Sequence, residues 1–311
     1  MQNNQKNSGN AKIAAIQFTD TDDLLDIRYD NIFKAVFTQE TPASKGALSG
    51  LISALIERKV IVEVITANEP PVEDAHERNI HFDISCKTES GEKINIEMIF
   101  NPKPNENVRL EYFASKLFNS QSIRGIDKSY SDLKETYQIA IIAKERMFSD
   151  DILVHTFQYY DPVHNISLRG KTRIITVELL KAERIVDKHI NEMETQEAWA
   201  VFFQYLTDRE KRVKINEILE RKEEIAMAGE TLITISRDER ERARLLSEEK
   251  YILDKQNAEV LARREGIEIG HAEGMQEGRK EGRAEGIQEE RQRFLELLDQ
   301  GLTAEEIKRR L

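Results

Sequence analysis

The stretch that decides the fold is NIHFDISCKTESGEKINIEMIF, residues 79–100, in which apolar and polar side chains alternate on both sides of the tripeptide at 89–91. Alternation with a period of two is typical of a β-strand, and a short glycine-containing break between two such runs predicts a β-hairpin. One face of this hairpin is apolar, and we expect it to pack on the core. That face comprises Ile80, Phe82, Ile84 and Cys86 with Ile94, Ile96, Met98 and Phe100.

The other face of the predicted hairpin is polar and holds two acidic residues. If the turn centres on Ser90, the numbers of paired residues sum to 180, so Asp83 lies across from Glu97, with Cβ atoms about 5 Å apart. Carboxylates that close repel each other unless a cation lies between them, and a hard divalent metal such as Mg²⁺ prefers oxygen ligands. The alternation equally fits the solvated face of an antiparallel sheet. The whole face comprises His81, Asp83, Ser85 and Lys87 with Lys93, Asn95, Glu97 and Ile99.

Segments on both sides of the hairpin complete an α/β domain. Upstream, apolar residues at helical spacing predict helices over 24–37 and 43–58, and the β-branched run at 60–66 predicts a strand. The downstream pattern predicts a helix over 107–122 and then strands at YQIAIIA (from Tyr137), HTFQYYD (155–161) and RIITVELL (173–180). The order is therefore helix, three strands, helix, strand.

The distribution of proline separates this α/β part from a helical part. All six prolines lie within the first 162 residues, and proline breaks helix interiors, so the remainder is predicted to be helical. The predicted parts are a flexible N-terminus (1–20), the α/β domain (21–182), a helical region (183–263), a Gly-x-x-x charged helical linker (264–290) and a small helical hairpin (291–311).

The predicted linker carries a glycine at every fourth residue from Gly266 to Gly286. The residues between these glycines are mainly charged, unlike the apolar membrane dimer motif, so the segment is either a spacer or a self-association helix. In the hairpin that follows, Gly301 is placed to end one helix, and Thr303 with Glu306 forms a capping box for the next. We expect the C-terminal helices to join copies of the chain into a homo-oligomer.

Composition excludes several classes of protein. The formal net charge of −11 argues against coating nucleic acid by bulk charge, and a single cysteine, Cys86, excludes a disulfide framework. No apolar run reaches the length of about 18 residues that a membrane span needs, and the polar start does not fit a signal peptide. A cytoplasmic protein without a membrane partner is expected. Phosphate-binding loops, Gly-x-Ser-x-Gly elbows and H-E-x-x-H motifs are absent, which disfavours ATPases, serine hydrolases and zinc proteases.

Several motifs, taken in order, resemble the PD-(D/E)XK nuclease superfamily and specifically the Rpn family of recombination-promoting nucleases and putative transposases. The similarity covers nearly the whole chain after about residue 20. The motifs are YDNIFKAVF (29–37), HFDIS around Asp83, INIEM around Glu97, RLEYFASKLFNSQSIRG (109–125), the turn at 127–130, VELLK (177–181), EAWAVFFQY, EEIAMA and the EG-rich tail.

This resemblance implies a fold and an activity. The fold is a PD-(D/E)XK core of α-β-β-β-α-β order followed by an all-helical C-terminal half, and the activity is that of a metal-dependent DNA endonuclease linked to recombination or mobile elements. Asp83 and Glu97 would bind Mg²⁺, with Mn²⁺ as a second candidate, and Asp30 of the first helix would assist. The metal would polarise the phosphate and acidify a water for attack on phosphorus.

One position departs from the family pattern. Two residues after the glutamate the family carries Lys, or Gln in the Rpn group, whereas this chain has Ile99. Isoleucine cannot orient water, and the loss of a positioned catalytic group typically costs about 10²–10⁴ in rate. His81 and Lys116 are nearby groups that can substitute, although both also fit an ordinary solvated position. The alternative function is therefore a catalytically impaired nuclease fold retained for DNA binding or oligomerisation.

The helix predicted after the hairpin has a basic and aromatic character. Arginine and lysine can meet phosphates, and tyrosine offers a stacking face to a base. A solvated helix with Tyr112 packed in the core is the competing interpretation. The candidate DNA contacts are Arg109, Tyr112, Lys116, Gln121 and Arg124.

Overall fold

A computed structural model describes residues 16–66, 83–121, 123, 129–301, 303 and 305. Its centre is a six-stranded mixed sheet with the strand order β1-β2-β3-β4-β8-β5. Strands β3, β4 and β8 run parallel to one another, and the remaining pairs are antiparallel. The strands are β1 (Val62–Ile65), β2 (Ile84–Thr88), β3 (Lys93–Ile99), β4 (Thr136–Ile142), β5 (Val154–Phe157) and β8 (Thr172–Glu178), and β6 (Tyr160–Asp161) pairs with β7 (Ile166–Ser167) in a separate ribbon.

The register of the hairpin between β2 and β3 is confirmed. Ile84 pairs with Ile96 and Lys87 with Lys93, so the numbers sum to 180 as predicted. Gly91 adopts a φ of +87°, which a residue without Cβ tolerates at no steric cost, and its N–H closes the turn onto the Thr88 carbonyl at 2.9 Å. The earlier part of the predicted first strand, including Ile80, His81 and Phe82, lies outside the described residues.

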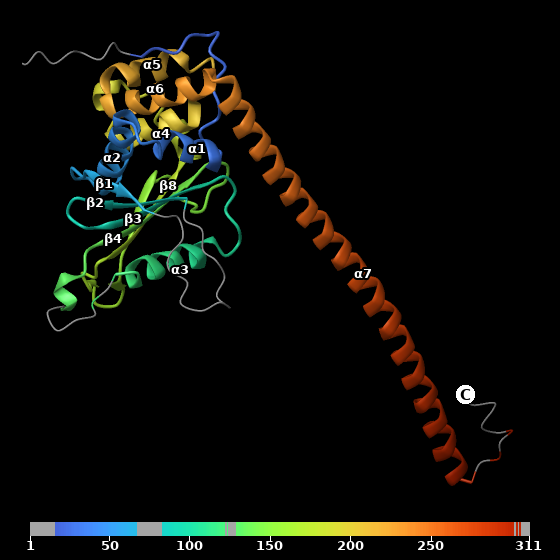
Figure 1. Cartoon of the computed structure of the whole chain (residues 1–311). Coiled ribbons are helices and arrows are strands. Elements are labelled where there is room, and N and C mark those ends of the chain that lie inside the picture. The colour runs from blue at the N-terminus through green and yellow to red at the C-terminus, as the bar shows by residue number, and fades with distance from the viewer. Residues whose placement is uncertain are drawn as a thin grey trace, which may run out of the picture. The chain divides into compact units, whose positions relative to one another are not determined.

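Helices cover the sheet unequally (Figure 1). A layer of five helices packs on one face, and a single helix, α3 (Glu106–Asn119), lies across the other. The larger layer buries a cluster of aromatic rings that includes Phe33, Phe37, Trp199 and Phe203. It comprises α1 (Asp30–Phe37), α2 (Pro42–Ile56), α4 (Thr195–Tyr205), α5 (Arg212–Arg221) and α6 (Glu223–Arg237).

The beginnings of the first two helices have local causes. The Thr41 side chain accepts a hydrogen bond from the Ser44 N–H at 3.1 Å, and Pro42 occupies the first helical position, where its missing N–H costs nothing. The first helix starts at Asp30 rather than at residue 24. The preceding apolar residues Leu24, Leu25 and Ile27 are buried without being helical, and the Leu25 N–H donates to Ser236 Oγ at 3.0 Å. Helical spacing therefore predicted burial correctly there and conformation wrongly.

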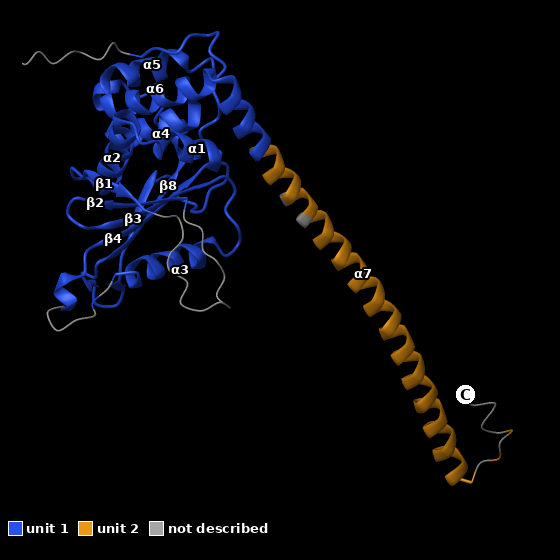
Figure 2. Ribbon diagram, viewed as in Figure 1, with its two compact units in different colours: residues 1–248 blue, residues 249–311 orange. Residues whose placement is uncertain are grey.

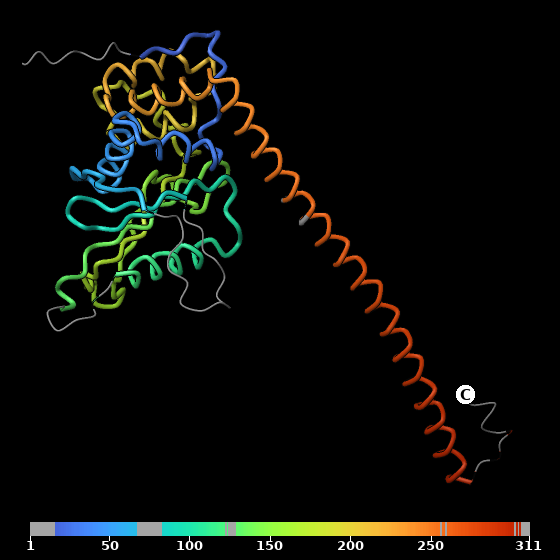
Figure 3. Tube along the Cα trace, in the orientation of Figure 1, coloured from blue at the N-terminus to red at the C-terminus, as the bar shows by residue number. Residues whose placement is uncertain are grey.

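The described residues divide into two compact units, 1–248 and 249–311 (Figure 2). Within the first unit one hydrophobic core runs from Phe18 to Leu245, so the residues on both sides of position 182 share it. That residues 21–182 fold independently of the rest of the chain stays a prediction. At the other end of this unit, residues 16–23 run beside α5 and α6 (Figure 3). Phe18 is held there by two backbone bonds to the Asn216 amide, 2.8 and 2.9 Å long.

The second unit consists mainly of helix α7 (Glu239–Asp299), whose first turns belong to the first unit. This one helix spans the predicted linker at 264–290 and the start of the predicted hairpin at 291–311. Gly301, with a φ of +84° and its N–H on the Leu298 carbonyl, follows its C-terminus. Most of the predicted last helix lies outside the described residues. Among the helices that the structure describes, none is long and apolar enough to cross a membrane.

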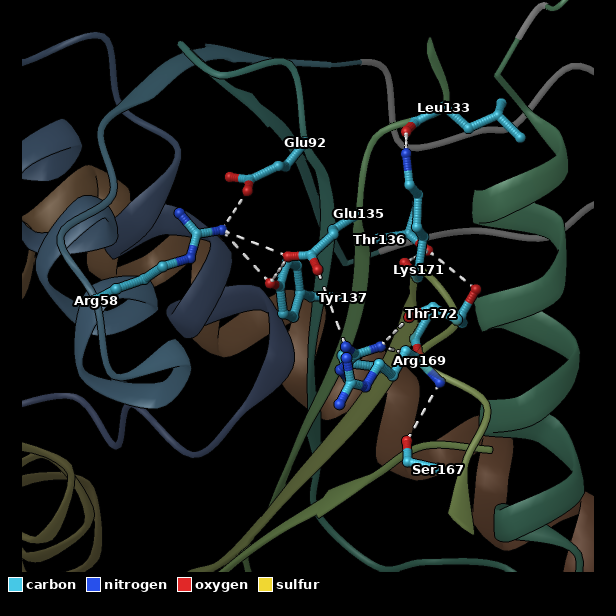
Figure 4. Close-up of polar contacts among 12 residues, drawn as sticks. Arg58, Glu92, Leu133, Glu135, Thr136, Tyr137, Ser167, Arg169, Lys171 and Thr172 are labelled. Atoms are coloured by element: carbon cyan, nitrogen blue, oxygen red, sulfur yellow. Dashed lines mark hydrogen bonds and ion pairs between the residues drawn. The ribbon is translucent and has the colours of Figure 1, made fainter. Parts of the chain in front are cut away.

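A charged network ties together the end of the sheet where the three parallel strands begin (Figure 4). Glu92, Glu135 and Lys171 each stand immediately before one of these strands. Arg58, just after α2, contacts Glu92 and lies 3.4 Å from the Tyr137 hydroxyl. Lys171 donates to the carbonyl of Ser131 at 3.1 Å. The network fixes the starts of these strands. The candidate site lies at the opposite end of β3.

Candidate functional site

The candidate site lies where β3 ends and β2 begins, beside the first turn of α1. Asp30 is the first residue of α1, where the helix dipole favours an acidic side chain. Lys34 follows one turn later, and its Nζ lies 2.8 Å from Asp30 Oδ2 and 3.2 Å from Asp83 Oδ1. One ammonium group therefore bridges two carboxylates that come from different elements.

Asp83 stands one residue before β2 and is fixed from both sides. Its Oδ1 faces Lys34, and its Oδ2 accepts a hydrogen bond from the Met98 N–H at 3.1 Å. Burial, followed by the charge of Asp30, raises the pKa of Asp83 to about 8, against the opposing influence of Lys34. The Asp83 carboxyl therefore takes up a proton more readily than an exposed aspartate does.

Glu97 lies on β3 and is 2% exposed. Arg109 Nη2 of α3 lies 2.8 Å from its Oε2, and the Asn95 amide donates to its Oε1 at 3.1 Å. Burial raises the pKa of Glu97, while Arg109 and Asn95 act in the opposite direction. Arg109 also pairs with Glu106 at 2.5 Å and lies over the Phe113 ring. Glu97 is thus a buried carboxylate held by a cation from the covering helix.

The centre of the hairpin's polar face, formed by Ser85, Asn95 and Glu97, is buried, so the interpretation of this face as solvated is wrong there. Asn95 and Gln138 are fully buried beneath α3, and Asn95 Nδ2 donates to Gln138 Oε1 at 2.9 Å. The antiparallel-sheet expectation fails because β3 pairs in parallel with β4 on its other side and is an interior strand. Buried polar groups cost free energy unless they are paired. The polar character of Asn95, Glu97 and Gln138 therefore does not serve solubility and needs another explanation.

Ile99 faces the same side as Glu97, as predicted, but it has an apolar environment. It is 7% exposed and packs with Leu110, Ala140 and Ile142. Of the two proposed substitutes, His81 lies outside the described residues. Lys116 lies seven residues beyond Arg109 on α3, about 10 Å along the axis, and its Nζ is 5.7 Å from the Tyr112 ring centroid. The cation that reaches Glu97 is Arg109.

The structure places the predicted DNA contacts in different environments. Arg109 is engaged by Glu97 and Glu106. Tyr112 is 46% exposed, so it is not a core residue. Gln121 exchanges two hydrogen bonds with the Lys134 backbone, 2.8 and 3.0 Å long. Arg124 lies outside the described residues. Their role towards DNA stays a prediction.

The donor set suits a hard divalent metal. Asp30 and Asp83 offer carboxylate oxygens around one cation position, and Asp30 Oδ1 is buried without a hydrogen-bond partner. Within the described ranges no three acidic, histidine or cysteine groups converge as a metal site, and Glu97 is paired with Arg109. The carboxylates therefore fit a metal that takes the place of the Lys34 ammonium.

Sequence reasoning missed several residues of this site. Lys34 could have been found, since Asp30 and Lys34 have the i, i+4 spacing at which helical side chains pair. Glu106 and Arg109 likewise have i, i+3 spacing. Gln138 carried no such signal, because only the pairing of β3 with β4 brings it beside Asn95.

Comparison with known proteins places these observations in one family. A family model described as PD-(D/E)XK nuclease family transposase matches residues 27–260, a range that includes Asp30, Asp83 and Glu97. No curated protein and no solved structure matches the chain.

Proposed function

The chain belongs to the PD-(D/E)XK nuclease family transposases, and on that premise we propose that it is a metal-dependent DNA endonuclease that hydrolyses phosphodiester bonds. A nuclease family implies DNA as the substrate, and PD-(D/E)XK nucleases generally use divalent metals. The observation that carries the proposal is the meeting of Asp30 and Asp83 at one cation position beside the strand that holds Glu97. Two carboxyl groups that face one cation position favour cation binding over stability.

We assign Asp83 and Glu97 as metal ligands and Asp30 as an assisting acid, with Mg²⁺, or else Mn²⁺, as the metal. When bound, the metal would polarise the phosphate and lower the pKa of a water molecule. Arg109 holds the Glu97 side chain in place through their 2.8 Å ion pair.

Lys34 is the residue that we propose for the role left open by Ile99. Its ammonium contacts Asp30 and Asp83, so a phosphate bound at these carboxylates would have this cation beside it. A cation at that position stabilises the charge that develops on phosphorus oxygens during hydrolysis. The family position on β3 is then free to be apolar, and Ile99 fills the contact with α3.

A second candidate function is supported by the same residues. Ile99 lacks a polar side-chain atom. Asp83 is already paired with Lys34, and Glu97 with Arg109. A nuclease fold with these features would suit a protein that binds DNA or assembles subunits without cutting.

The test is nicking of supercoiled plasmid by the full chain with Mg²⁺ or Mn²⁺. We expect wild type to nick and Asp83→Asn, which keeps the side-chain shape, to lose the activity. Glu210→Gln, at an exposed acid in the loop before α5, is the matched control and should nick like wild type. Nicking that survives Asp83→Asn would refute this site. An inert wild type with an active Ile99→Gln variant would establish the impaired nuclease, and DNA binding by inert proteins would favour the second candidate function.

A further inference from the structure

A second site lies on the same face of the sheet as Glu97, on the far side of α3. It is a pocket of about 390 Å³ between α3, β8 and the segment that follows β5. This volume falls within the range of about 300–1,000 Å³ that small-molecule sites occupy. Its aromatic walls are Phe148, Phe157 and Tyr159, and its floor includes Thr176 of β8.

The walls of the pocket are held in place by buried interactions. Glu178 accepts hydrogen bonds from the N–H groups of Met147 and Phe148, 2.6 and 3.2 Å long, and forms a fully buried ion pair with Lys181. The Phe148 ring lies 5.4 Å from that of Phe157. On the opposite rim, the Tyr159 ring rests on Gly170, where a Cβ would come within 3.2 Å of it. These contacts preorganise the walls before any ligand binds.

The floor of the pocket has an unused polar group. Thr176 is 1% exposed, yet its hydroxyl has no hydrogen-bond partner. An unpaired buried hydroxyl costs free energy, and a ligand that hydrogen-bonds to it recovers that cost. Phe157 and Tyr159, at 41% and 55% exposed, in addition present open ring surface.

The charge of the lining selects a neutral planar ligand. Among the described residues that line the pocket, Glu111 carries the only charge, so these residues offer no cation to a phosphate or carboxylate. Aromatic faces, a hydroxyl on the floor and the amide of Gln158 suit a nucleobase, which stacks on rings and hydrogen-bonds at its edges.

The strand register connects this pocket with the acidic site. Glu97 pairs with Ala140, and Ala140 pairs with Thr176, so Glu97 and Thr176 are two strands apart in one row. At the usual strand spacing this separation is about 10 Å. The acidic site and the pocket therefore lie on the same face of the sheet, with α3 between them.

We propose that this pocket holds an unstacked nucleobase of the DNA strand on which the acidic site acts. The inference rests on the proposed function, and it makes DNA with unpaired or single-stranded bases the preferred substrate class. Stacking on the aromatic walls and a hydrogen bond to Thr176 supply the affinity for the extruded base.

The test compares two fluorescent duplexes in binding titrations, with EDTA present to prevent hydrolysis. One duplex carries a single unpaired nucleotide, and the other carries an abasic residue at the same place. We expect wild type to bind the first about 5- to 100-fold more tightly, the range that base–aromatic stacking gives. Tyr159→Ala and Thr176→Val should reduce this ratio while leaving affinity for the abasic duplex unchanged. Tyr130→Ala, at an exposed tyrosine away from the pocket lining, is the matched control.

The outcomes separate the pocket from the nuclease. An equal ratio in wild type and Tyr159→Ala, with plasmid nicking intact, overturns the nucleobase pocket and leaves the proposed function standing. No nicking and no binding of either duplex refutes the proposed function and the pocket with it. Free nucleosides that raise the melting temperature of wild type, without any preference for the unpaired base in DNA, would show a nucleoside site and overturn the DNA source.

Discussion

Lys34 connects the acidic residues more directly than any residue of the hairpin does, and its replacement is the sharpest test at the scale of single residues. Its Nζ contacts Asp30 at 2.8 Å and Asp83 at 3.2 Å. We expect Lys34→Met to lower the plasmid nicking rate by about 10²–10⁴, as for other positioned catalytic groups. Lys34→Arg, which keeps the charge, should retain more activity.

The control for this prediction is Lys45→Met, because Lys45 is exposed on α2. Both methionine variants remove one positive charge, so a general effect of net charge on DNA binding would appear in both. Equal nicking rates for Lys34→Met and wild type would remove Lys34 from the mechanism.

Asp83 gives a prediction about stability in the metal-free protein. Its pKa is raised in the folded state from 3.8 to about 8, so the folded protein binds its proton more tightly than the unfolded chain does. The contribution of this group to the free energy of unfolding therefore falls as pH rises between about 4 and 8. Asp83→Asn has no proton to lose, and we expect it to be more stable than wild type at pH 8, by about 1–3 kcal/mol.

The measurement is urea unfolding in EDTA at several pH values. The stability difference between Asp83→Asn and wild type should shrink steadily as the pH is lowered towards 4. A difference that stays constant with pH would mean that the carboxyl is ionised in the folded protein and that Lys34 compensates it fully.

At the scale of elements, α3 covers the polar face of the hairpin and sets its environment. Substitutions at Ile99 test how well α3 excludes water from this face. Ile99 packs with Leu110 of α3 and with Ala140 and Ile142 of β4. Ile99→Gln would bury an amide without a partner, which costs about 1–3 kcal/mol in the free energy of unfolding. Ile99→Val removes only a methylene and should cost about 0.5–1.5 kcal/mol. Urea unfolding of the two variants tests this, and a Gln variant as stable as wild type would show that the amide reaches water or a polar partner.

The same elements show how far the sequence could predict the structure. Alternation along 79–100 was enough for the register of β2 and β3, because a period of two and one turn leave few pairings open. The burial of Asn95 and Glu97 could not be predicted from it, since the pattern says nothing about which helix covers the polar face or which strand pairs with β3. The Lys34–Asp83 contact likewise depends on how α1 packs beside the sheet. Local spacing is readable in the sequence, whereas tertiary contacts between distant segments are not.

At the scale of the whole molecule, the exposed stripe of α7 carries the predicted self-association. Leu246, Leu253, Val260 and Ile267 follow one another at intervals of seven residues and are 40–65% exposed, to the nearest five per cent. Residues seven apart return to nearly the same helix face, which is the pattern that pairs helices in coiled coils. A helix of 61 residues with this stripe gains apolar burial when a second copy of the helix packs against it. We therefore expect the full chain to form homo-oligomers through α7, with Leu253→Glu/Val260→Glu shifting it towards monomer in sedimentation velocity runs. Ile269→Glu, which changes an exposed apolar residue on another face of the helix, should leave the mass unchanged, and a wild-type chain that stays monomeric across a hundredfold range of concentration would rule out this role for α7.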